Sequence, residues 1–435
     1  YDGSSKFAKD HRYAFFPSVS AAWRISEENF WQPLKGWWND MKIRGSYGSL
    51  GNQVMDNLGN FPYLATYGTN SSYNYLINGS KPVIVKAPGL VASDFTWETV
   101  TQMDFGFDAS FLNNRLTGTF DWYRRNTKDM LVAGATLPAT LGASVPKSNS
   151  ADMKTIGWEL SLGWNDRLEN GFSYWVKGVL SDYQATITKY AGNDAGFYSQ
   201  SDGDGKYYVG QKIGEIWGYH SNGLFQSDDE AATIDQSELY AGKWGAGDVK
   251  YEDLDGNGKI TKGEETIYNP GDKSIIGNKT PRYQFGITVG FDYKNFDFEM
   301  FWQGTGKRDY MLSGAQFWGF TSQWDVPYTP ALDYWTETNT DAYFPRPGWQ
   351  NGGNRVTSDR YLQSAAYGRL KNLTVGYTIP KNLTTKWGIS RLRLYVTGEN
   401  LLTITPLNDA FDPETLGGLT YPINRKVAIG LNLTL

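Results

Sequence analysis

The 435-residue chain has a formal net charge of -5, 16% aromatic residues and a mean hydropathy of -0.51. Its acidic balance argues against a nucleic-acid partner, because binding nucleic acid requires a basic face that neutralises phosphates. The sequence contains no cysteine, which excludes a disulfide framework and thiolate chemistry.

The apolar residues are not arranged as a membrane-spanning helix would require. No run of about 18 apolar residues occurs in the sequence, so a transmembrane helix is excluded. A closed β-barrel is the only other fold that satisfies its backbone hydrogen bonds within lipid. Many aromatic residues with a hydrophilic average suit a barrel that has an aromatic outer surface and a polar interior. Any membrane-spanning form of the chain is therefore predicted to be a barrel.

Strict alternation of apolar and polar or small residues predicts the strands. Between residues 283 and 293, the apolar set Phe285, Ile287 and Val289 is bounded by aromatic residues at both ends, as two membrane interfaces favour. In chain order, strands are predicted near 12–24, 40–50, 98–111, 115–126, 153–165, 171–187, 281–292, 296–303, 367–378, 391–403 and 423–435. Several are about ten residues or longer, the length that a tilted strand needs to cross a bilayer.

The predicted connections between strands alternate in length. Tight turns are expected around residues 113, 169 and 294, whereas the long connections are 51–97, 127–152, 188–280, 304–366 and 404–422. Outer-membrane barrels have short periplasmic turns and long extracellular loops, so the long connections are predicted to lie outside the cell.

The predicted strand number indicates an incomplete barrel. Single-chain bacterial barrels have even strand numbers, so about eleven strands are expected to form half of a plugged barrel of about 22 strands. The predicted fold class is thus an all-β transmembrane antiparallel β-barrel, and 1–435 is expected to be its C-terminal part. The other half and an N-terminal plug are expected to precede residue 1.

Several segments are similar to one known family. They are DGSSKFAKDHRYAFFPSVSAAWRISEENF from Asp2, MKIRGSYGSLGNQ from Met41, WETVTQMDFGFDASFLNNRLTGTFDWYRRNTKDML from Trp97, IGEIWGYHSNGLFQS from Ile213, GDVKYEDLDGNGKIT from Gly247, IGNKTPRYQFGITVGFDYKNFDF from Ile276, and YGRLKNLTVGYTIP and LYVTGENLLT near the end. Over nearly its whole length, the chain resembles the C-terminal half of SusC/RagA-type TonB-dependent outer-membrane transporters of Bacteroidetes.

The resemblance implies an energised nutrient importer in the bacterial outer membrane, in contact with its lipid. It implies a SusD-like surface lipoprotein as partner, and TonB contacted through an N-terminal region that these 435 residues lack. Glycans or oligosaccharides are the expected substrates, and peptides imported by the same mechanism are the alternative.

Residues 253–264 match the twelve-residue calcium-loop pattern. The predicted ligands are Asp253, Asp255, Asn257, the Lys259 carbonyl, Thr261 through water and bidentate Glu264. Oxygen ligands favour calcium over zinc, so a structural calcium ion is expected to order about residues 247–270 for contact with the lipoprotein. A hydrophilic turn that binds no ion is the alternative. The acidic string at Asp202 and Asp204 lacks the later ligands and is predicted to be a turn.

The long connection 304–366 is unusually aromatic. Aromatic rings stack on sugars and anchor protein interfaces, so substrate or partner contacts are predicted there, and self-packing into a compact lid is the favoured alternative. The candidate residues are Trp318, Phe320, Trp324, Tyr328, Trp335 and Trp349, accompanied by Tyr343 and Phe344. The same alternatives apply to Tyr63, Tyr67, Tyr73 and Tyr75 in an earlier connection.

Alternation also predicts polar residues that line the barrel interior: Asp104, Asp108, Asp121, Glu159, Arg393 and Glu399. Most are expected to be a solvated wall of paired charges. The sequence has only His11 and His220 as histidines and no HExxH, GxSxG or Walker motif, so no enzyme activity is expected. Two alternatives to a transporter are a barrel enzyme, which requires a nucleophile and histidine clustered at the outer rim, and a soluble carbohydrate-binding protein, which predicts strands of about five or six residues.

Overall fold

The computed structural model describes residues 1–435 except 54–59, 71–75, 78, 82, 87, 93–94, 134–137, 139, 141, 143–144, 192, 194–195, 198–206 and 417–420. The helices in the described part are all short, and none is long and apolar enough to cross a membrane. They are α1 (Asp228–Ala231), α2 (Ala315–Trp318), α3 (Lys381–Thr384) and the 3-10 turns η1 (Lys9–His11), η2 (Ile25–Glu27), η3 (Asn29–Leu34), η5 (Thr329–Leu332), η6 (Gly352–Arg355), η7 (Asp359–Tyr361) and η8 (Thr385–Trp387).

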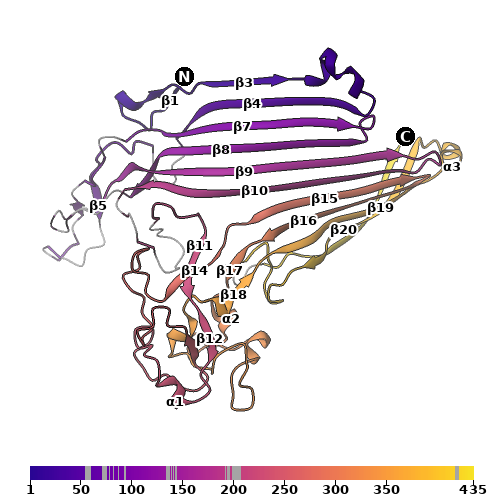
Figure 1. Ribbon diagram of the computed structural model, residues 1–435. Helices are drawn as coiled ribbons and strands as arrows, with labels where there is room; N and C mark the ends of the chain where they lie inside the picture. Colours follow the sequence, from indigo (N-terminus) through magenta and orange to yellow (C-terminus); the bar gives the residue numbers. More distant parts are fainter. Residues whose placement is uncertain are drawn as a thin grey trace.

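One antiparallel sheet of eleven strands organises the structure (Figure 1). Its strands follow one another in chain order from edge to edge, so the sheet is a continuous meander. They are β3 (Ser18–Trp23), β4 (Trp38–Asn52), β7 (Glu98–Phe111), β8 (Leu116–Ala133), β9 (Lys147–Arg167), β10 (Ser173–Tyr190), β15 (Arg282–Tyr293), β16 (Phe296–Lys307), β19 (Tyr367–Thr378), β20 (Arg391–Ile404) and β21 (Lys426–Thr434). The all-β prediction is confirmed, and β3 and β21 remain the two edges of a sheet that does not close within these residues.

Ten further strands form five small two-stranded sheets. The pairs are β1 (Asp2–Gly3) with β2 (Tyr13–Ala14), β5 (Gly68–Asn70) with β6 (Ile84–Lys86), β11 (Glu215–Tyr219) with β14 (Lys273–Asn278), β12 (Ser221–Leu224) with β13 (Val249–Tyr251), and β17 (Asp309–Met311) with β18 (Leu362–Ser364). Most of them lie within the connections at one end of the main sheet. That end is called the long-loop end below, and the opposite end is called the short-turn end.

One strand and one connection have bounds that differ clearly from those that the alternation pattern predicts. The strand predicted near 12–24 is the six-residue β3, because the residues before it pair separately as β1 and β2. The connection predicted at 127–152 is shorter, because β8 and β9 continue to pair as far as Ala133 and Lys147. Bulges around Met130 interrupt the regular register there, which hides the alternation from the sequence.

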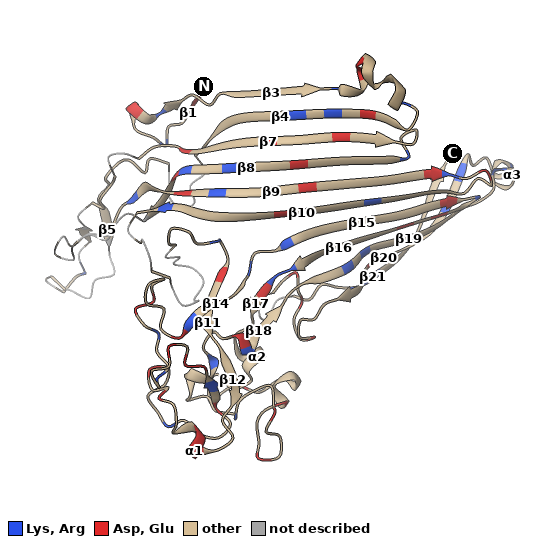
Figure 2. Cartoon of the chain, in the orientation of Figure 1, with Lys and Arg blue, Asp and Glu red and all other residues tan. Residues whose placement is uncertain are grey.

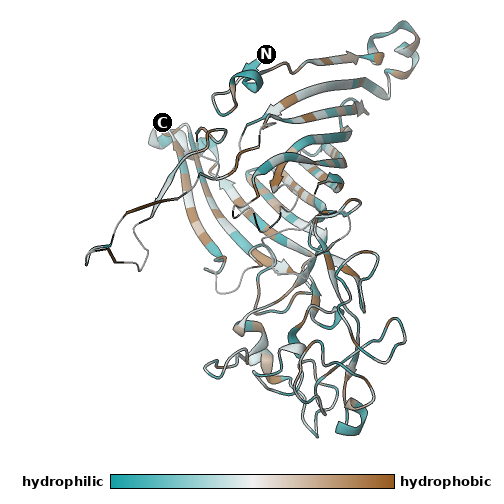
Figure 3. Ribbon diagram, turned by 90° about the vertical axis from the view of Figure 1, so that its left-hand side faces the viewer, coloured by the Kyte–Doolittle hydropathy of each residue, from teal (hydrophilic) through white to brown (hydrophobic). Residues whose placement is uncertain are grey.

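The main sheet has one apolar and one polar face. Brown and teal bands alternate along its strands in Figure 3. On β21, Val427, Ile429 and Leu431 are exposed on the apolar face, and they pair with Gly398, Val396 and Leu394 of β20. Asn432 pairs with Arg393 on the other face. A strand whose apolar side chains stay exposed along its length is suited to lipid on that face.

Charges on the polar face are mostly paired across strands, as predicted for a solvated wall. Arg44 of β4 contacts Asp121 of β8 at 2.7 Å and Asp108 of β7 at 3.3 Å, with Asp104 at 3.8 Å. Arg393 contacts Asp297 at 2.9 Å, and Glu399 lies 3.4 Å from Lys426. These appear as isolated blue and red bands along the strands in Figure 2. Glu159, which lies opposite Asp121, is exposed in a hollow of about 300 Å³.

Close packing of the strands can be tested at two glycines. In β15, a methyl group at Gly290 would lie 2.2 Å from Cζ2 of Trp175, which crosses over it from β10. In β10, a methyl group at Gly178 would meet nothing within 4 Å. We expect G290A to lower the free energy of unfolding by about 1–3 kcal/mol, since the ring must move, and G178A to leave it unchanged. Urea titration monitored by gel mobility would measure both, and equal losses would contradict this packing.

Candidate functional site

Three long connections fold together into a single body at the long-loop end. It is called the outer-loop body here and comprises residues 215–278, 309–364 and 405–416; it occupies the lower part of Figure 1, around α1, α2 and β12. All three segments contribute to one buried apolar cluster, for example through Tyr251, Phe317 and Phe411. The connections are therefore a packed structure with a core of its own.

The aromatic residues of connection 304–366 supply much of this core. The Trp318 and Tyr361 rings meet edge to face at 4.5 Å, and Phe317 meets Phe344 at 5.1 Å. Trp318 and Trp335 are both buried. Edge-to-face pairs add about 0.5–1.5 kcal/mol each beyond the burial of their area, so Trp318 stabilises the body through its ring contacts, and Trp335 does so through burial in the same core.

The other aromatic candidates are partly or fully accessible. Trp324 is 83% exposed, and Tyr328 and Trp349 are also exposed. Phe320 is partly buried, and its carbonyl accepts a hydrogen bond from Arg355 at 3.2 Å. Two of the six candidates are therefore buried and pack in the core, three are exposed, and Phe320 is intermediate.

The earlier tyrosines are also separated. Tyr63 packs against a second cluster formed by Phe7, Phe95 and Trp97, whereas Tyr67 is exposed. Tyr73 and Tyr75, like Asp202 and Asp204, lie outside the described residues.

Ion pairs tie the third connection to the polar face of the main sheet. The almost fully buried Arg369 of β19 contacts Asp412 at 2.5 Å and Glu414 at 3.1 Å, and Lys371 contacts Glu414 at 3.0 Å. Leu407 enters the core of the outer-loop body from the same segment. Residues 405–416 thus connect the outer-loop body to the main sheet, a role that no pattern in the sequence predicts.

A cavity of about 420 Å³ opens within the outer-loop body, between its segments 309–364 and 405–416. Its lining includes Tyr343, Arg360, Gln363 and Asn408. The Tyr343 hydroxyl accepts a hydrogen bond from Gln363 at 2.9 Å, and Arg360 donates to the carbonyl of Ala342 at 2.6 Å. Polar groups beside an aromatic ring form a site that suits a polar ligand.

The first half of the predicted calcium loop has an ordered turn. The Asp253 carboxylate accepts hydrogen bonds from the backbone N–H groups of Gly256, Asn257 and Gly258 at 2.7, 3.2 and 2.7 Å. The bond from Gly258 contributes most to lowering the pKa of Asp253. Asn257 in turn accepts from the N–H of Lys259 at 2.8 Å. Gly256 and Gly258 both have positive φ, which glycine adopts without strain.

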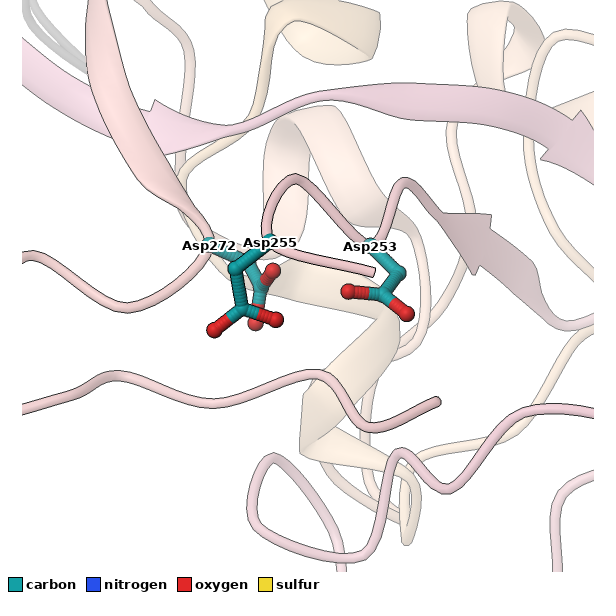
Figure 4. Close-up of side chains that lie close together, drawn as sticks. All are labelled: Asp253, Asp255 and Asp272. Atoms are coloured by element: carbon teal, nitrogen blue, oxygen red, sulfur yellow. The ribbon is translucent and has the colours of Figure 1, made fainter. Parts of the chain in front are cut away.

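The second half of the loop differs from the twelve-residue pattern. Carboxylate oxygens of Asp253, Asp255 and Asp272 lie within 4.8 Å of one another (Figure 4), and Glu264 is not in this group. The chain turns back between Gly263 and Gly271, and the N–H of Asp272 donates to the carbonyl of Thr261 at 3.0 Å. Glu264 thus lies outside this group, and the turn instead brings the later residue Asp272 beside Asp253 and Asp255.

Asp272 is fully buried, and its carboxylate accepts from the N–H groups of Leu254 and Thr261 at 2.8 and 2.7 Å. Three carboxylates this close repel one another unless a cation lies between them. Their hard oxygen atoms fit Ca²⁺. Asp253, Asp255 and Asp272 would hold such an ion, with Asn257 and Thr261 beside them, and the ion would supply charge neutralisation.

His220 joins three segments of the outer-loop body. Its Nδ1 lies 2.8 Å from Oδ2 of Asp359, and its Nε2 lies 2.7 Å from Oγ of Ser274. The sequence revealed no such grouping, because the three residues come from β14, η7 and the link between β11 and β12. Acyl transfer additionally requires oxyanion donors and a substrate pocket. We interpret the arrangement as a structural tie between these segments.

The model of the family described as "TonB dependent receptor-like, beta-barrel" matches residues 1–401. TonB-dependent receptor P3 of Formosa agariphila is 31% identical over 99% of the chain, which covers 43% of that relative. TonB-dependent receptor SusC of Bacteroides thetaiotaomicron is 28% identical over the full chain, which covers 41% of SusC. The chain thus spans less than half the length of these curated relatives.

Solved structures show the same fold. The structure of the RagAB peptide transporter matches 99% of the chain with a TM-score of 0.76 and 22% sequence identity, and the chain covers 44% of that protein chain. The RagAB peptide importer in its "open-open" state gives the same TM-score.

Proposed function

Because the chain belongs to the TonB-dependent receptor β-barrel family of outer-membrane proteins, we propose that it forms the C-terminal wall and outer loops of an energised glycan importer. The family consists of transporters, so no catalytic residues are assigned. One observation carries the proposal: a meander of long strands with an apolar and an ion-paired polar face bears a folded body at a single end. Such a body is placed to select ligands at the mouth of a pore.

Glycans are proposed as substrates on the chemistry of the outer-loop body. Exposed Trp324 and Trp349 offer flat faces of the kind that stack on sugar rings. The cavity beside Tyr343 adds hydrogen-bonding groups from Arg360, Gln363 and Asn408, which suit hydroxyl-rich ligands. Peptides are the second candidate, since the protein with a similar fold is described as a peptide transporter.

Uptake by intact cells tests this function. Deletion of the gene should abolish accumulation of at least one labelled oligosaccharide, and dissipation of the proton-motive force should do the same in cells that retain it. A parallel panel of labelled peptides distinguishes the two substrate classes. Unchanged uptake of both panels after deletion would contradict an importer.

We further propose that a SusD-like surface lipoprotein covers the outer-loop body. The exposed residues of the outer-loop body include Trp324, Val326, Tyr328, Leu332 and Trp349. Large apolar side chains gathered on one segment are typical of interfaces, where tryptophan and tyrosine contribute most of the binding energy.

Co-purification tests the partner surface. The double variant W324A/W349A should retain about a tenth or less of the lipoprotein that co-purifies with the unaltered protein, since two hot-spot residues each contribute about 2 kcal/mol. W387A is the control, because the exposed fraction of Trp387 lies between those of Trp324 and Trp349 and Trp387 lies in η8 at the short-turn end. Equal recovery from all three proteins would show that the lipoprotein binds elsewhere.

We also propose a structural Ca²⁺ ion held by Asp253, Asp255 and Asp272. The ion would neutralise the three carboxylates and fix the turn from Thr261 to Asp272. Tyr251 and Ile260, which lie close to Asp253 and Thr261 in the sequence, are buried in the core of the outer-loop body. A fixed turn would therefore also hold this part of the body in place. Calcium then acts on the shape of the surface that meets the partner.

Chelation of calcium should expose residues 253–272 to proteases, and added Ca²⁺ should restore resistance. D272N should be cleaved rapidly with or without chelator, because it removes a buried ligand. E264Q should behave as the unaltered protein, since Glu264 lies outside the group. If chelation leaves the rate of protease cleavage unchanged, no ion is bound at this turn. If E264Q makes the turn sensitive to protease, Glu264 is a ligand, as the twelve-residue pattern predicts.

A further inference from the structure

The connection between β3 and β4 is one of two longer connections at the short-turn end, and the other is residues 379–390 with α3 and η8. At this end, β7 and β8 are joined by residues 112–115 and β15 and β16 by residues 294–295. Residues 24–37 instead form two 3-10 turns, η2 and η3, that project beyond the strands at the top of Figure 1. This segment is called the aromatic knob below.

The knob has a defined internal structure. Trp31 is buried, its Nε1–H donates to the carbonyl of Trp38 at 3.1 Å, and the two indole rings meet at 4.6 Å. Arg24 contacts Asp40 at 2.8 Å, and Lys35 lies 3.5 Å from Glu27. The knob is thus anchored to the start of β4 by an indole and an ion pair, which limits how its other side chains can turn.

Two large aromatic side chains of the knob remain uncovered. Phe30 is 62% exposed and Trp37 is 50% exposed. Exposed rings on an otherwise ordered connection leave apolar area in contact with water unless something covers it.

Both rings continue the apolar face of the main sheet. The ring of Phe30 lies 6.5 Å from the ring of Trp23 in β3. Trp23 and Val19 are on the apolar face of β3, where they pair with Ile43 and Tyr47 of β4. The Tyr47 side chain is exposed on that face.

Trp37 is linked to the same face through β7. Its ring stacks on Phe111 at 6.0 Å, and Phe111 belongs to the alternating row that contains Phe105 and Phe107. The apolar face is the lipid-facing surface of an outer-membrane protein, so both uncovered rings extend an existing lipid contact beyond the ends of the strands.

We propose that the aromatic knob is an interfacial anchor that inserts Phe30 and Trp37 among phospholipid headgroups at the short-turn end. Tryptophan and phenylalanine favour this depth because their rings leave water while the backbone stays hydrated. The ion pairs Arg24–Asp40 and Lys35–Glu27 give the knob the polar groups that an interfacial element requires. The anchor is independent of transport and rests on the outer-membrane location.

Site-specific labelling can locate the knob relative to lipid. The 435 residues contain no cysteine, so F30C, W37C and Q32C can each carry one environment-sensitive fluorophore in the intact protein, with any cysteine outside these residues replaced by serine. The protein is reconstituted into vesicles of phosphatidylethanolamine and phosphatidylglycerol. Gln32 is the matched control, because it is exposed in the same 3-10 turn and points to another side from Phe30.

Quenching by lipids spin-labelled near the headgroup should be about threefold stronger at positions 30 and 37 than at 32, and quenching by aqueous iodide should show the reverse order. Equal iodide quenching at all three positions would overturn the anchor. Shielding from iodide without quenching by lipid would also overturn it, because protein would then cover the rings.

A measurement on the unaltered protein guards against labels that disturb folding. A phospholipid with a photoreactive group near its headgroup should crosslink to residues 24–37 more than to the tight turn at 168–172, as mapped by mass spectrometry. Crosslinking that avoids 24–37 while it labels the strands would overturn the proposal.

Discussion

The ladder of backbone hydrogen bonds across the eleven-stranded sheet is the constraint on which the rest of this structure depends. Within lipid no water replaces a missing partner, so every peptide group must be paired along the strand. Long strands in a meander meet that requirement, and the pleat then directs alternate side chains to opposite faces. The apolar face and the ion-paired polar face both follow from this one geometric rule.

The rigid main sheet also explains why the connections, and not the strands, are free to vary in length and structure. Strand ends fix the start and end of each connection, so a long connection can fold without disturbing the sheet. Three connections use this freedom to build the outer-loop body around Phe317, Trp318 and Tyr361. The salt bridges from Arg369 to Asp412 and Glu414 then join this body to the wall. A movement of the body would have to break buried charge pairs, which is costly.

The two ends of the sheet meet different surroundings. The long-loop end presents a folded surface with exposed tryptophans, a polar cavity and a group of three carboxylates. The short-turn end presents compact turns and the aromatic knob. The features that we propose to recognise ligands and partners are thus at one end, and the proposed lipid anchor is at the other.

The sequence by itself determined the all-β architecture, the approximate strands and their two faces, because a period of two is a local property that each strand displays. The turn around Gly258, which the calcium-loop pattern predicts, is also local. Tertiary structure decided what depends on distant segments. A turn of the chain brought Asp272 beside the carboxylates of Asp253 and Asp255. Packing of three connections buried Trp318 and left Trp324 exposed, although both lie in one aromatic segment. The contacts of His220 and Arg369 join residues far apart in the chain, and no local pattern could reveal them.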